Sequence, residues 1–547
     1  MIRSITDILP LELIVEIFMM LDYRSLVTCQ QVCRLFHTLI AGSSPLQYAL
    51  ELAIAGKQDN SLSSFDFSHK LAALRQYQAA WGTLKWTNTK DIPMLRGNLW
   101  ELYGGVLAQS ELDCTIRFRR LPSQIREIEE HVWSVSTSDM DLRDFTMDPA
   151  QDLLVLIARP KQHRALDTRL EIAVHLRSLT TGNRHPLAPD PSILQHSIDE
   201  GVVEFSFIVQ VCEDRVAVNF ISHGAVPSEL VVWNWKTGRK ELNLRGPDLR
   251  AVSFLANHYI LAGGFEDCNW FTEARLYVLD LTKCDGEPVT LEDVNYHCAF
   301  LYPPCSRWVT PLGFQIRTDP MSPWVPPASS NVPFFVDRDS RLLVITMFVA
   351  IGQELVSFDL FVLSRALLSF AEGLGPGSDR HNFSWEDWGP KNTRLMESPP
   401  HSQVWVCFVF GTKFASLVHG DFTFEDEADV RTLEVWDFNL NGVRRERCRG
   451  IVDAMEVEGD HIVEWHDHDS SMVHHAVFLE NIQTSLPYRI VRRDLPSQKL
   501  GDGFADVLCS EDNLILVDVW SLVAVSCQSS DSDTYQALDR NIRLLTF

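Results

Sequence analysis

The N-terminal part of the chain, from Ile5 to Ile40, places its apolar residues at helical spacing. Leu21-Asp22 ends a first helix, for which Pro10 suits the first turn, and Asp22 and Ser25 are both candidate caps of the next helix. The stripe along the first helix, at i, i+3, i+4 and i+7, consists of Ile14, Ile17, Phe18 and Leu21. The apolar face of a second helix comprises Cys29, Val32, Cys33, Phe36, Leu39 and Ile40.

Helices as short as these cannot bury enough surface to be stable alone. Their apolar residues occupy more than one face, so they need a partner in the rest of the chain or in another protein. Residues 46–81 continue the helical pattern in two segments, with a polar break between them at Gly56–Ser64. One face of that segment carries Leu71, Leu74, Gln78 and Trp81.

From about Trp100 the pattern changes to short apolar runs separated by turn residues, which predicts β-strands. Four segments repeat one order: an apolar strand, a small polar residue, a large apolar residue and a polar turn. The polar and apolar pairs are Ser178-Leu179, Asn234-Trp235, Asp280-Leu281 and Asp437-Phe438, with weaker copies at Asp359 and Asn481.

A hairpin-like pair of apolar strands precedes each repeat, as in "DFTMDPAQDLLVLIAR". This order is typical of propeller blades. We therefore predict a mixed, mainly β chain: a small all-α N-terminal region and helical connector, followed by a β-propeller-like domain of roughly six or seven blades. A pair of β-sandwiches is the alternative. Thr318–Pro333 and Glu372–Ser384 are expected to form long loops between blades.

The composition limits the classes of function that the chain can have. A formal net charge of −25, from 48 basic and 73 acidic residues, disfavours binding to nucleic acid or an anionic membrane. The cluster Arg444, Arg445, Arg447 and Arg449 is expected in a solvated turn. No signal peptide is recognisable, and 12 cysteines without a CxxC pair indicate reduced thiols in the cytoplasm or the nucleus.

Candidate chemistry is sparse. The sequence contains no Walker A, HExxH, GxSxG or paired CxxC pattern, so we predict no catalytic residue, no cofactor and no metal site. The segment "HIVEWHDHDSSMVHH" could offer His466 and His468 to zinc, but it is better explained as a polar hairpin. Trp385 and Trp388, in "SWEDWGP", are expected in or beside a loop and are the candidate substrate contacts.

The N-terminal residues resemble the F-box, whose pattern is roughly LPxE(I/L)xxxIFxxL followed by L and VCRxW/FxxL. The likeness spans residues 5–45, and Phe36 stands where the family often has Trp. It implies binding to the Skp-type adaptor of an SCF (Skp, cullin, F-box) ubiquitin ligase. The residues expected to bind the adaptor are Leu9, Pro10, Leu13, Ile14, Ile17, Phe18, Leu21, Leu26, Val32, Cys33 and Phe36. The alternative is a helical hairpin that caps the next domain.

The whole chain is similar, more loosely, to fungal F-box proteins with a propeller-like C-terminal half; the cues are "VVWNWKTGR" and "FTMDPAQDLLVL". We expect an F-box region at residues 1–45, a connector at 46–95 and the propeller-like domain at 96–547. The resemblance implies a non-catalytic substrate receptor of a ubiquitin ligase, with the adaptor, a cullin and an unidentified protein substrate as partners. A non-ligase scaffold is the alternative function, and an enzyme with a propeller pocket is disfavoured.

Overall fold

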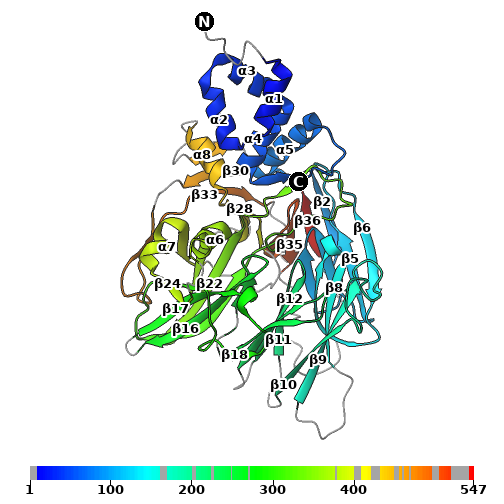
Figure 1. Cartoon of the computed structure of the whole chain (residues 1–547), viewed down its shortest axis with the longest axis vertical. Helices are drawn as coiled ribbons and strands as arrows, with labels where there is room; N and C mark the ends of the chain where they lie inside the picture. Colours follow the sequence, from blue (N-terminus) through cyan, green and yellow to red (C-terminus); the bar gives the residue numbers. More distant parts are fainter. Residues whose placement is uncertain are drawn as a thin grey trace, which may run out of the picture.

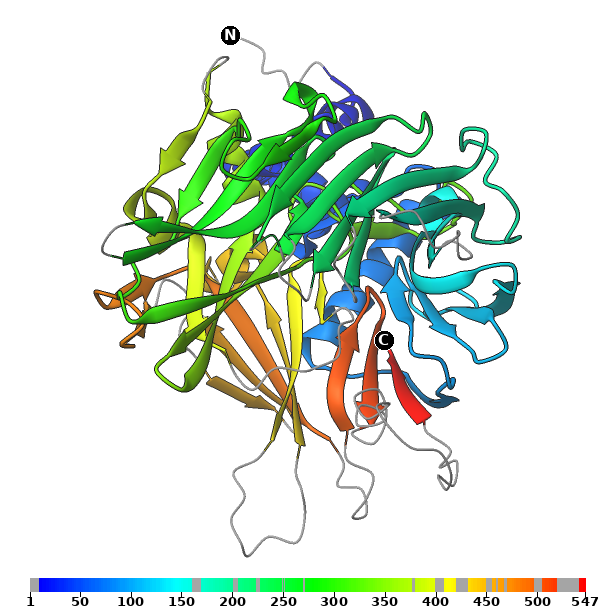
Figure 2. The same cartoon turned by 90° about the horizontal axis from the view of Figure 1, so that it is seen from below.

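Seven β-sheets form a ring, and a group of helices lies against one end of it (Figures 1 and 2). The computed structural model describes residues 9–547 except 160–168, 200–204, 223–226, 248, 250, 269–270, 376–378, 399–407, 420–430, 449–454, 459–460, 467–469, 496–503 and 519–540. In that part of the chain no helix is both long and apolar enough to cross a membrane.

The N-terminal helices are α1 (Leu11–Met19), α2 (Tyr23–Val32), α3 (Arg34–Gly42), α4 (Ser44–Ala55) and α5 (Phe67–Gly82). Asp22 caps α2, as one of the two predicted candidates, because its side chain accepts from the backbone N–H groups of Arg24 and Ser25 at 2.8 and 3.0 Å. The prediction of a single second helix is wrong, because two helices, α2 and α3, occupy this segment. Cys33 is extended, with φ −158° and ψ 163°, and it separates α2 from α3.

Each sheet of the ring is one blade. Blade 1 contains β3 (Trp100–Tyr103), β4 (Val106–Ser110), β5 (Thr115–Arg120) and β6 (His131–Ser136). Blade 2 contains β7 (Asp141–Asp148), β8 (Leu153–Arg159), β9 (Arg169–Ser178) and β10 (Ile193–Asp199). Blade 3 contains β11 (Phe205–Cys212), β12 (Arg215–Ser222), β13 (Ser228–Asn234), β14 (Lys240–Gly246) and β18 (Pro288–Thr290). Blade 4 contains β15 (Ala251–Phe254), β16 (Tyr259–Cys268), β17 (Phe271–Asp280), β19 (Cys298–Leu301) and β24 (His381–Phe383).

The remaining blades complete the ring. Blade 5 contains β20 (Val309–Arg317), β22 (Leu342–Ile351), β23 (Glu354–Leu363) and β25 (Thr393–Glu397). Blade 6 contains β26 (Val409–Phe410), β27 (Lys413–His419), β28 (Arg431–Asp437), β33 (Tyr488–Asp494), β30 (His461–His466) and β29 (Met455–Glu458). Blade 7 contains β34 (Phe504–Cys509), β35 (Asn513–Asp518), β36 (Asn541–Thr546) and β2 (Asn88–Pro93). The predicted propeller is confirmed, with seven blades.

Shorter elements decorate the blades. Two strand pairs lie outside them, β1 (Lys57–Asp59) with β21 (Phe334–Val336) and β31 (Ser471–Val473) with β32 (Ile482–Thr484). The later helices are α6 (Ser364–Glu372), α7 (Trp385–Asn392) and α8 (Leu440–Cys448). The arginine cluster therefore begins in helix α8 rather than in the predicted turn, and Arg449 lies outside the described residues.

Blade 7 closes the ring with strands from both ends of the chain. β2 pairs antiparallel with β36, with Ile92 opposite Ile542, so a strand from the N-terminal part completes a sheet of C-terminal strands. The predicted boundary at residue 95 therefore falls after the first propeller strand. Such closure leaves only short, protected sheet edges, so few strand edges are open to pairing with another chain.

The repeat found in the sequence corresponds to one backbone hydrogen bond that recurs in every blade. In each blade, the residue that follows the third strand donates its backbone N–H to a carbonyl in the segment that connects the first strand to the second. The seven bonds are Leu121→Gly105, Leu179→Asp152, Trp235→Asp214, Leu281→His258, Ser364→Arg341, Phe438→Thr412 and Phe547→Asp512. Except for Ser364, the donor carries a large apolar side chain that is buried, so the bond and the packing fix each blade corner together.

The two weaker copies of the repeat are not equivalent positions. Asp359 lies in the middle of β23 and accepts from the Thr346 hydroxyl at 2.7 Å. Asn481 lies just before β32, outside the main sheet of blade 6.

Both predicted inter-blade loops are insertions within blade 5. Glu372–Ser384 contributes β24 to the sheet of blade 4. The Pro-rich segment Thr318–Pro333 crosses the end of the ring that faces the helices. There the N–H of Met321 donates to the Tyr103 hydroxyl at 3.2 Å and the Trp324 indole donates to Asp148 at 2.9 Å, which ties blade 5 to blades 1 and 2.

Replacing Phe547 by Ala tests the closure of blade 7. Phe547 is buried and stacks on Trp81 of α5, with ring centroids 4.2 Å apart, so the substitution leaves a cavity between the ring and the helices. We expect the free energy of unfolding to fall by about 3–5 kcal/mol in chemical denaturation. The control Leu112→Ala, at an exposed position, should change it by about 0.5 kcal/mol or less. Equal stability of the two variants would contradict this account of the closure.

Candidate adaptor-binding surface

The N-terminal helices have a core of their own. Ile14 and Phe18 of α1 and Leu26 of α2 are buried together with Ile40, Leu46 and Leu50. The ring of Phe18 meets that of Phe36 edge to face, with centroids 5.0 Å apart. This inner stripe of α1 therefore packs α1 against α2–α4.

Three of the predicted adaptor contacts are corrected by this arrangement. Ile14, Phe18 and Leu26 are at most 4% exposed, so they stabilise the helices and offer no surface to a partner. Leu9, Leu21 and Phe36 are half-buried against the same core. The remaining predicted contacts are exposed: Pro10, Leu13, Ile17, Val32 and Cys33.

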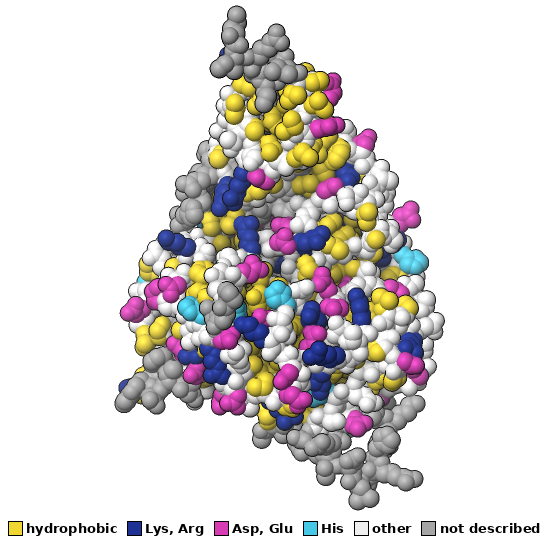
Figure 3. All heavy atoms as spheres, in the orientation of Figure 1, with side chains coloured by type: hydrophobic (Ala, Val, Ile, Leu, Met, Phe, Trp, Pro, Cys, Tyr) yellow, Lys and Arg dark blue, Asp and Glu magenta, His cyan; other side chains and the backbone are white. Residues whose placement is uncertain are grey.

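A second set of apolar side chains covers the outside of α1–α3. We call it the exposed apolar surface; it consists of Leu11, Leu13, Ile17, Met19, Met20, Val27, Val32 and Leu35. Met20 is 87% exposed, Val32 64% and Ile17 47%. Figure 3 shows hydrophobic side chains gathered on this end of the molecule. Apolar side chains clustered in this way mark a binding surface, because their exposure to water is unfavourable.

Five members of this surface were missed by the sequence analysis: Leu11, Met19, Met20, Val27 and Leu35. The signal was present along α1, where Leu13, Ile17 and Met20 form a second stripe at i, i+4 and i+7. Leu13 and Ile17 of this stripe were among the predicted contacts, but Met20, just after α1, was not.

The helical connector fixes these helices to the propeller. Leu71, Leu74 and Trp81 of the predicted apolar face of α5 are buried against blades 6 and 7, as is Tyr77. At the start of α8, which follows β28 of blade 6, the Asn439 and Asn441 amides donate to backbone carbonyls of α4 at 2.6 and 2.9 Å. The exposed apolar surface is therefore held on a body that packs onto the ring.

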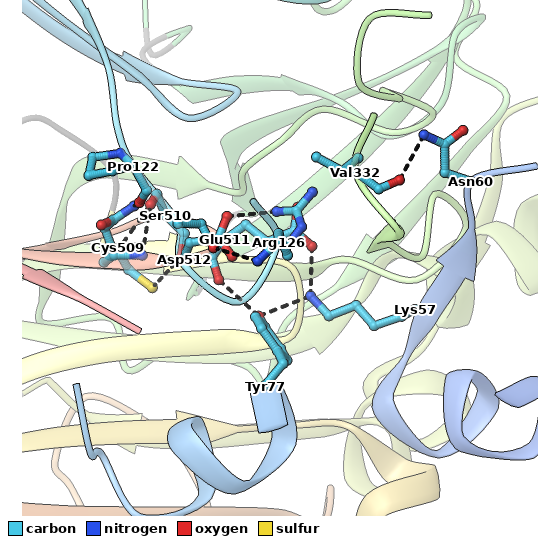
Figure 4. A network of polar contacts seen from close by, with 12 residues as sticks. Lys57, Asn60, Tyr77, Pro122, Arg126, Val332, Cys509, Ser510, Glu511 and Asp512 are labelled. Atoms are coloured by element: carbon cyan, nitrogen blue, oxygen red, sulfur yellow. Dashed lines mark hydrogen bonds and ion pairs between the residues drawn. The ribbon is translucent and has the colours of Figure 1, made fainter. Parts of the chain in front are cut away.

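A buried ion cluster joins the connector to the closing blades (Figure 4). Glu511, in the β34–β35 turn, accepts from the Lys57 ammonium at 2.8 Å, and its other oxygen lies 3.0 Å from Arg126 of blade 1. Arg126 also pairs with Asp512 at 2.7 Å. The Tyr77 hydroxyl accepts from Lys57 at 3.1 Å and donates to the Glu511 carbonyl at 2.9 Å.

The electrostatics of this cluster keep Glu511 ionised. Burial alone would raise the pKa of Glu511, but the nearby Arg126 and Lys57 charges outweigh it and hold that pKa below its usual value. Burial lowers the pKa of Lys57 to about 8, against the opposing effect of Glu511, so Lys57 still carries its proton at neutral pH. The cluster is thus a compensated set of charges.

Trp385 and Trp388 are not exposed loop residues, so the prediction of a substrate contact there is wrong. Both lie in α7 and are buried in the core of blades 4 and 5. The Trp388 indole donates to the carbonyl of Leu301 at 2.9 Å, and its ring lies 5.1 Å from that of Phe300. The capping box of Ser384 and Asp387 starts a helix where the sequence pattern indicated a loop.

The polar segment around His466 forms strands rather than a ligand cluster. His466 stacks on Tyr488 and lies 3.6 Å from Glu464, while His468 is outside the described residues. Among the residues that the structure describes, no group of three or more His, Cys, Asp and Glu side chains could hold a metal ion.

The axis of the propeller contains a cavity of about 180 Å³ with an acidic wall. Burial raises the pKa of Glu101 and of Asp144 to about 7, and Arg317 lines the same cavity. The described lining holds no serine, cysteine or histidine, and its Thr146 hydroxyl donates to the Glu101 carboxylate at 3.3 Å.

Comparisons with known proteins agree with this division of the chain. Residues 6–44 match the family model described as F-box-like. The chain thus carries an F-box-like domain followed by a seven-bladed β-propeller, and this combination indicates an F-box protein of the substrate-adaptor type. F-box proteins of this type are typically non-catalytic subunits. No curated protein matches the sequence.

Two solved structures are similar in outline. One is the WD40 domain of SCAP from fission yeast, at 8% identity and a TM-score of 0.33, covering 82% of this chain and 84% of that one. The other is Hsv2 of Kluyveromyces lactis, at 11% identity and a TM-score of 0.18, covering 56% of this chain and 98% of that one. Likeness at this level is too loose to support a conclusion, and the propeller is assigned from its own seven sheets.

Replacing Lys57 by Met tests the ion cluster. The substitution keeps the length of the side chain but removes one cation from a buried carboxylate, so we expect a loss of about 3–5 kcal/mol in the free energy of unfolding. Lys90→Met is the matched control, because Lys90 pairs with Glu130 at 2.6 Å on the surface and should contribute about 1 kcal/mol or less. If the two variants unfold at the same denaturant concentration, the cluster does not anchor the connector.

Proposed function

We propose that the protein is the substrate-receptor subunit of an SCF-type ubiquitin ligase. In this proposal a Skp-type adaptor covers the exposed apolar surface of α1–α3 and connects the protein to a cullin, while the propeller recruits a protein substrate. The observation that carries the proposal is that the F-box-like helices still expose a cluster of large apolar side chains although their own core is complete. Burial of these side chains against a partner would stabilise the complex, because it removes apolar surface from water.

The receptor contributes position rather than chemistry. It would hold a substrate lysine near a ubiquitin-charged enzyme, raising the effective concentration of one reactant at the other. Such a role requires a defined distance between adaptor and substrate, and the packing of α4 and α5 on blades 6 and 7 supports it.

In this proposal the protein substrate binds at the end of the ring away from the helices. Trp308 precedes β20, and Leu355 follows the β22–β23 turn, so both lie at strand ends opposite the turns that the connector contacts. They are 66% and 76% exposed. Exposed Trp and Leu side chains at this rim are suited to contact a protein.

We assign the activity to the cytoplasm or the nucleus as part of the same proposal. The nine cysteines whose side chains the structure describes are free thiols, as suits a reducing compartment.

The proposal is tested by retention of a recombinant Skp-type adaptor on the immobilised full-length protein. We expect wild type to retain it and Ile17→Asp and Met20→Asp each to weaken binding by about 1–3 kcal/mol, because a charge then faces an apolar interface. Both side chains are exposed, so the melting temperature should not change. Leu187→Asp, at an exposed position on the propeller, is the matched control and should bind as wild type does.

Two outcomes would overturn the adaptor proposal: no retention by the wild-type protein, or equal retention by the Ile17→Asp and Met20→Asp variants. Cullin co-purification and ubiquitination of bound proteins then separate a receptor from a scaffold that binds adaptor without ligase activity.

A further inference from the structure

A cavity of about 370 Å³ lies where the connector meets blade 6. Its walls come from α4 and α5 on one side and from α8 and the ends of β27, β28, β30 and β33 on the other. The side chains that matter most for its chemistry are Arg75, Trp81, Lys413, Trp465 and Arg489. The space is large enough for a small organic molecule.

Lys413 is the unusual group of this wall. The residue is only 8% exposed, and its ammonium lies over the rings of Trp81 and Tyr77, 5.0 and 5.5 Å from their centroids. Within the part of the chain that the structure describes, that ammonium has no carboxylate at ion-pair distance and no hydrogen-bond acceptor. Aromatic faces attract a cation, but they compensate for lost water much less than an anion does.

The other cations of the wall already have partners. Arg445 lies 2.8 Å from Glu51, and Arg489 lies 3.5 Å from Asp437 and over the ring of Trp465. Arg75, at the rim, is 3.8 Å from Glu51.

The charges of the wall therefore do not balance. The lining contains the cations Arg75, Lys413, Arg445 and Arg489 and the carboxylates Glu51, Asp437 and Glu446, which leaves one positive charge in excess. In a chain of formal net charge −25, a cavity with a positive excess is a local exception.

We propose that this cavity binds a small organic anion through a phosphate or carboxylate group that pairs with Lys413. The aromatic rings of Trp81 and Trp465 would contact the remainder of the ligand, and Arg75 would contact its anionic group from the rim. Such a ligand touches the connector and blade 6 at once, so its binding stabilises the junction between the F-box-like domain and the propeller. The proposal does not depend on adaptor binding.

The test is titration of the full-length protein with inorganic phosphate, pyrophosphate and citrate at constant ionic strength, followed by melting temperature and calorimetry. We expect at least one of these anions to raise the melting temperature with saturation. The phosphate and citrate arms show which anionic group the cavity prefers. Lys413→Met should weaken that binding about tenfold or more, since it removes a charged hydrogen-bond donor.

Matched variants show whether a loss of anion binding is specific to the cavity. Lys240→Met removes another lysine whose ammonium lies over a tryptophan, Trp233, in blade 3, and should bind as wild type does. If Lys413→Met does not fold, Arg75→Gln at the half-exposed rim replaces it and should also weaken binding, whereas Arg143→Gln on blade 2 should not. Adaptor retention should be unchanged in all four variants.

Three results would overturn the proposal. They are the absence of saturable binding of all three anions, equal binding by the cavity variants and wild type, and binding of an oligoglutamate peptide without binding of any small anion. The last result would assign the cavity to an acidic segment of a protein partner.

Discussion

The ion cluster of Lys57, Glu511 and Arg126 is the contact on which the arrangement of the whole chain depends. Each charge would be costly to bury alone, and each has a partner of opposite sign within 3.0 Å. The three residues come from the connector, the last blade and the first blade. Because a misplaced partner would leave a buried charge uncompensated, the cluster favours one placement of the helices over the ring.

The contacts that close the ring are therefore also the contacts that position the F-box-like domain. β2 follows α5 directly and completes blade 7, and the C-terminal Phe547 returns to stack on Trp81 of α5. The Pro-rich insertion of blade 5 adds a further tie, since β21 pairs with β1 of the connector. A chain built in this way cannot open its last blade without loosening the body that carries the exposed apolar surface.

Sequence reasoning predicted the propeller and the F-box-like helices, but it misplaced individual side chains. The propeller was predictable because pairs such as Asn234-Trp235 and Asp437-Phe438 recur at one blade corner, where the same backbone bond is made each time. Trp388 was misplaced because the capping box that begins α7 lies in a segment rich in loop-forming residues. Phe18 was assigned to the partner on the resemblance to the F-box, because the spacing identifies an apolar face but does not say whether that face meets this chain or another.

The central claim is that α1–α4 form a small core of their own and that the apolar surface on the outside of α1–α3 binds an adaptor. Hydrogen exchange of the full-length protein, with and without a recombinant Skp-type adaptor, tests it most directly. The account predicts that the adaptor slows exchange across α1–α3, residues 11–42, and leaves the sheets of the seven blades unchanged. Protection confined to the propeller, or none in these helices at saturating adaptor, would contradict it.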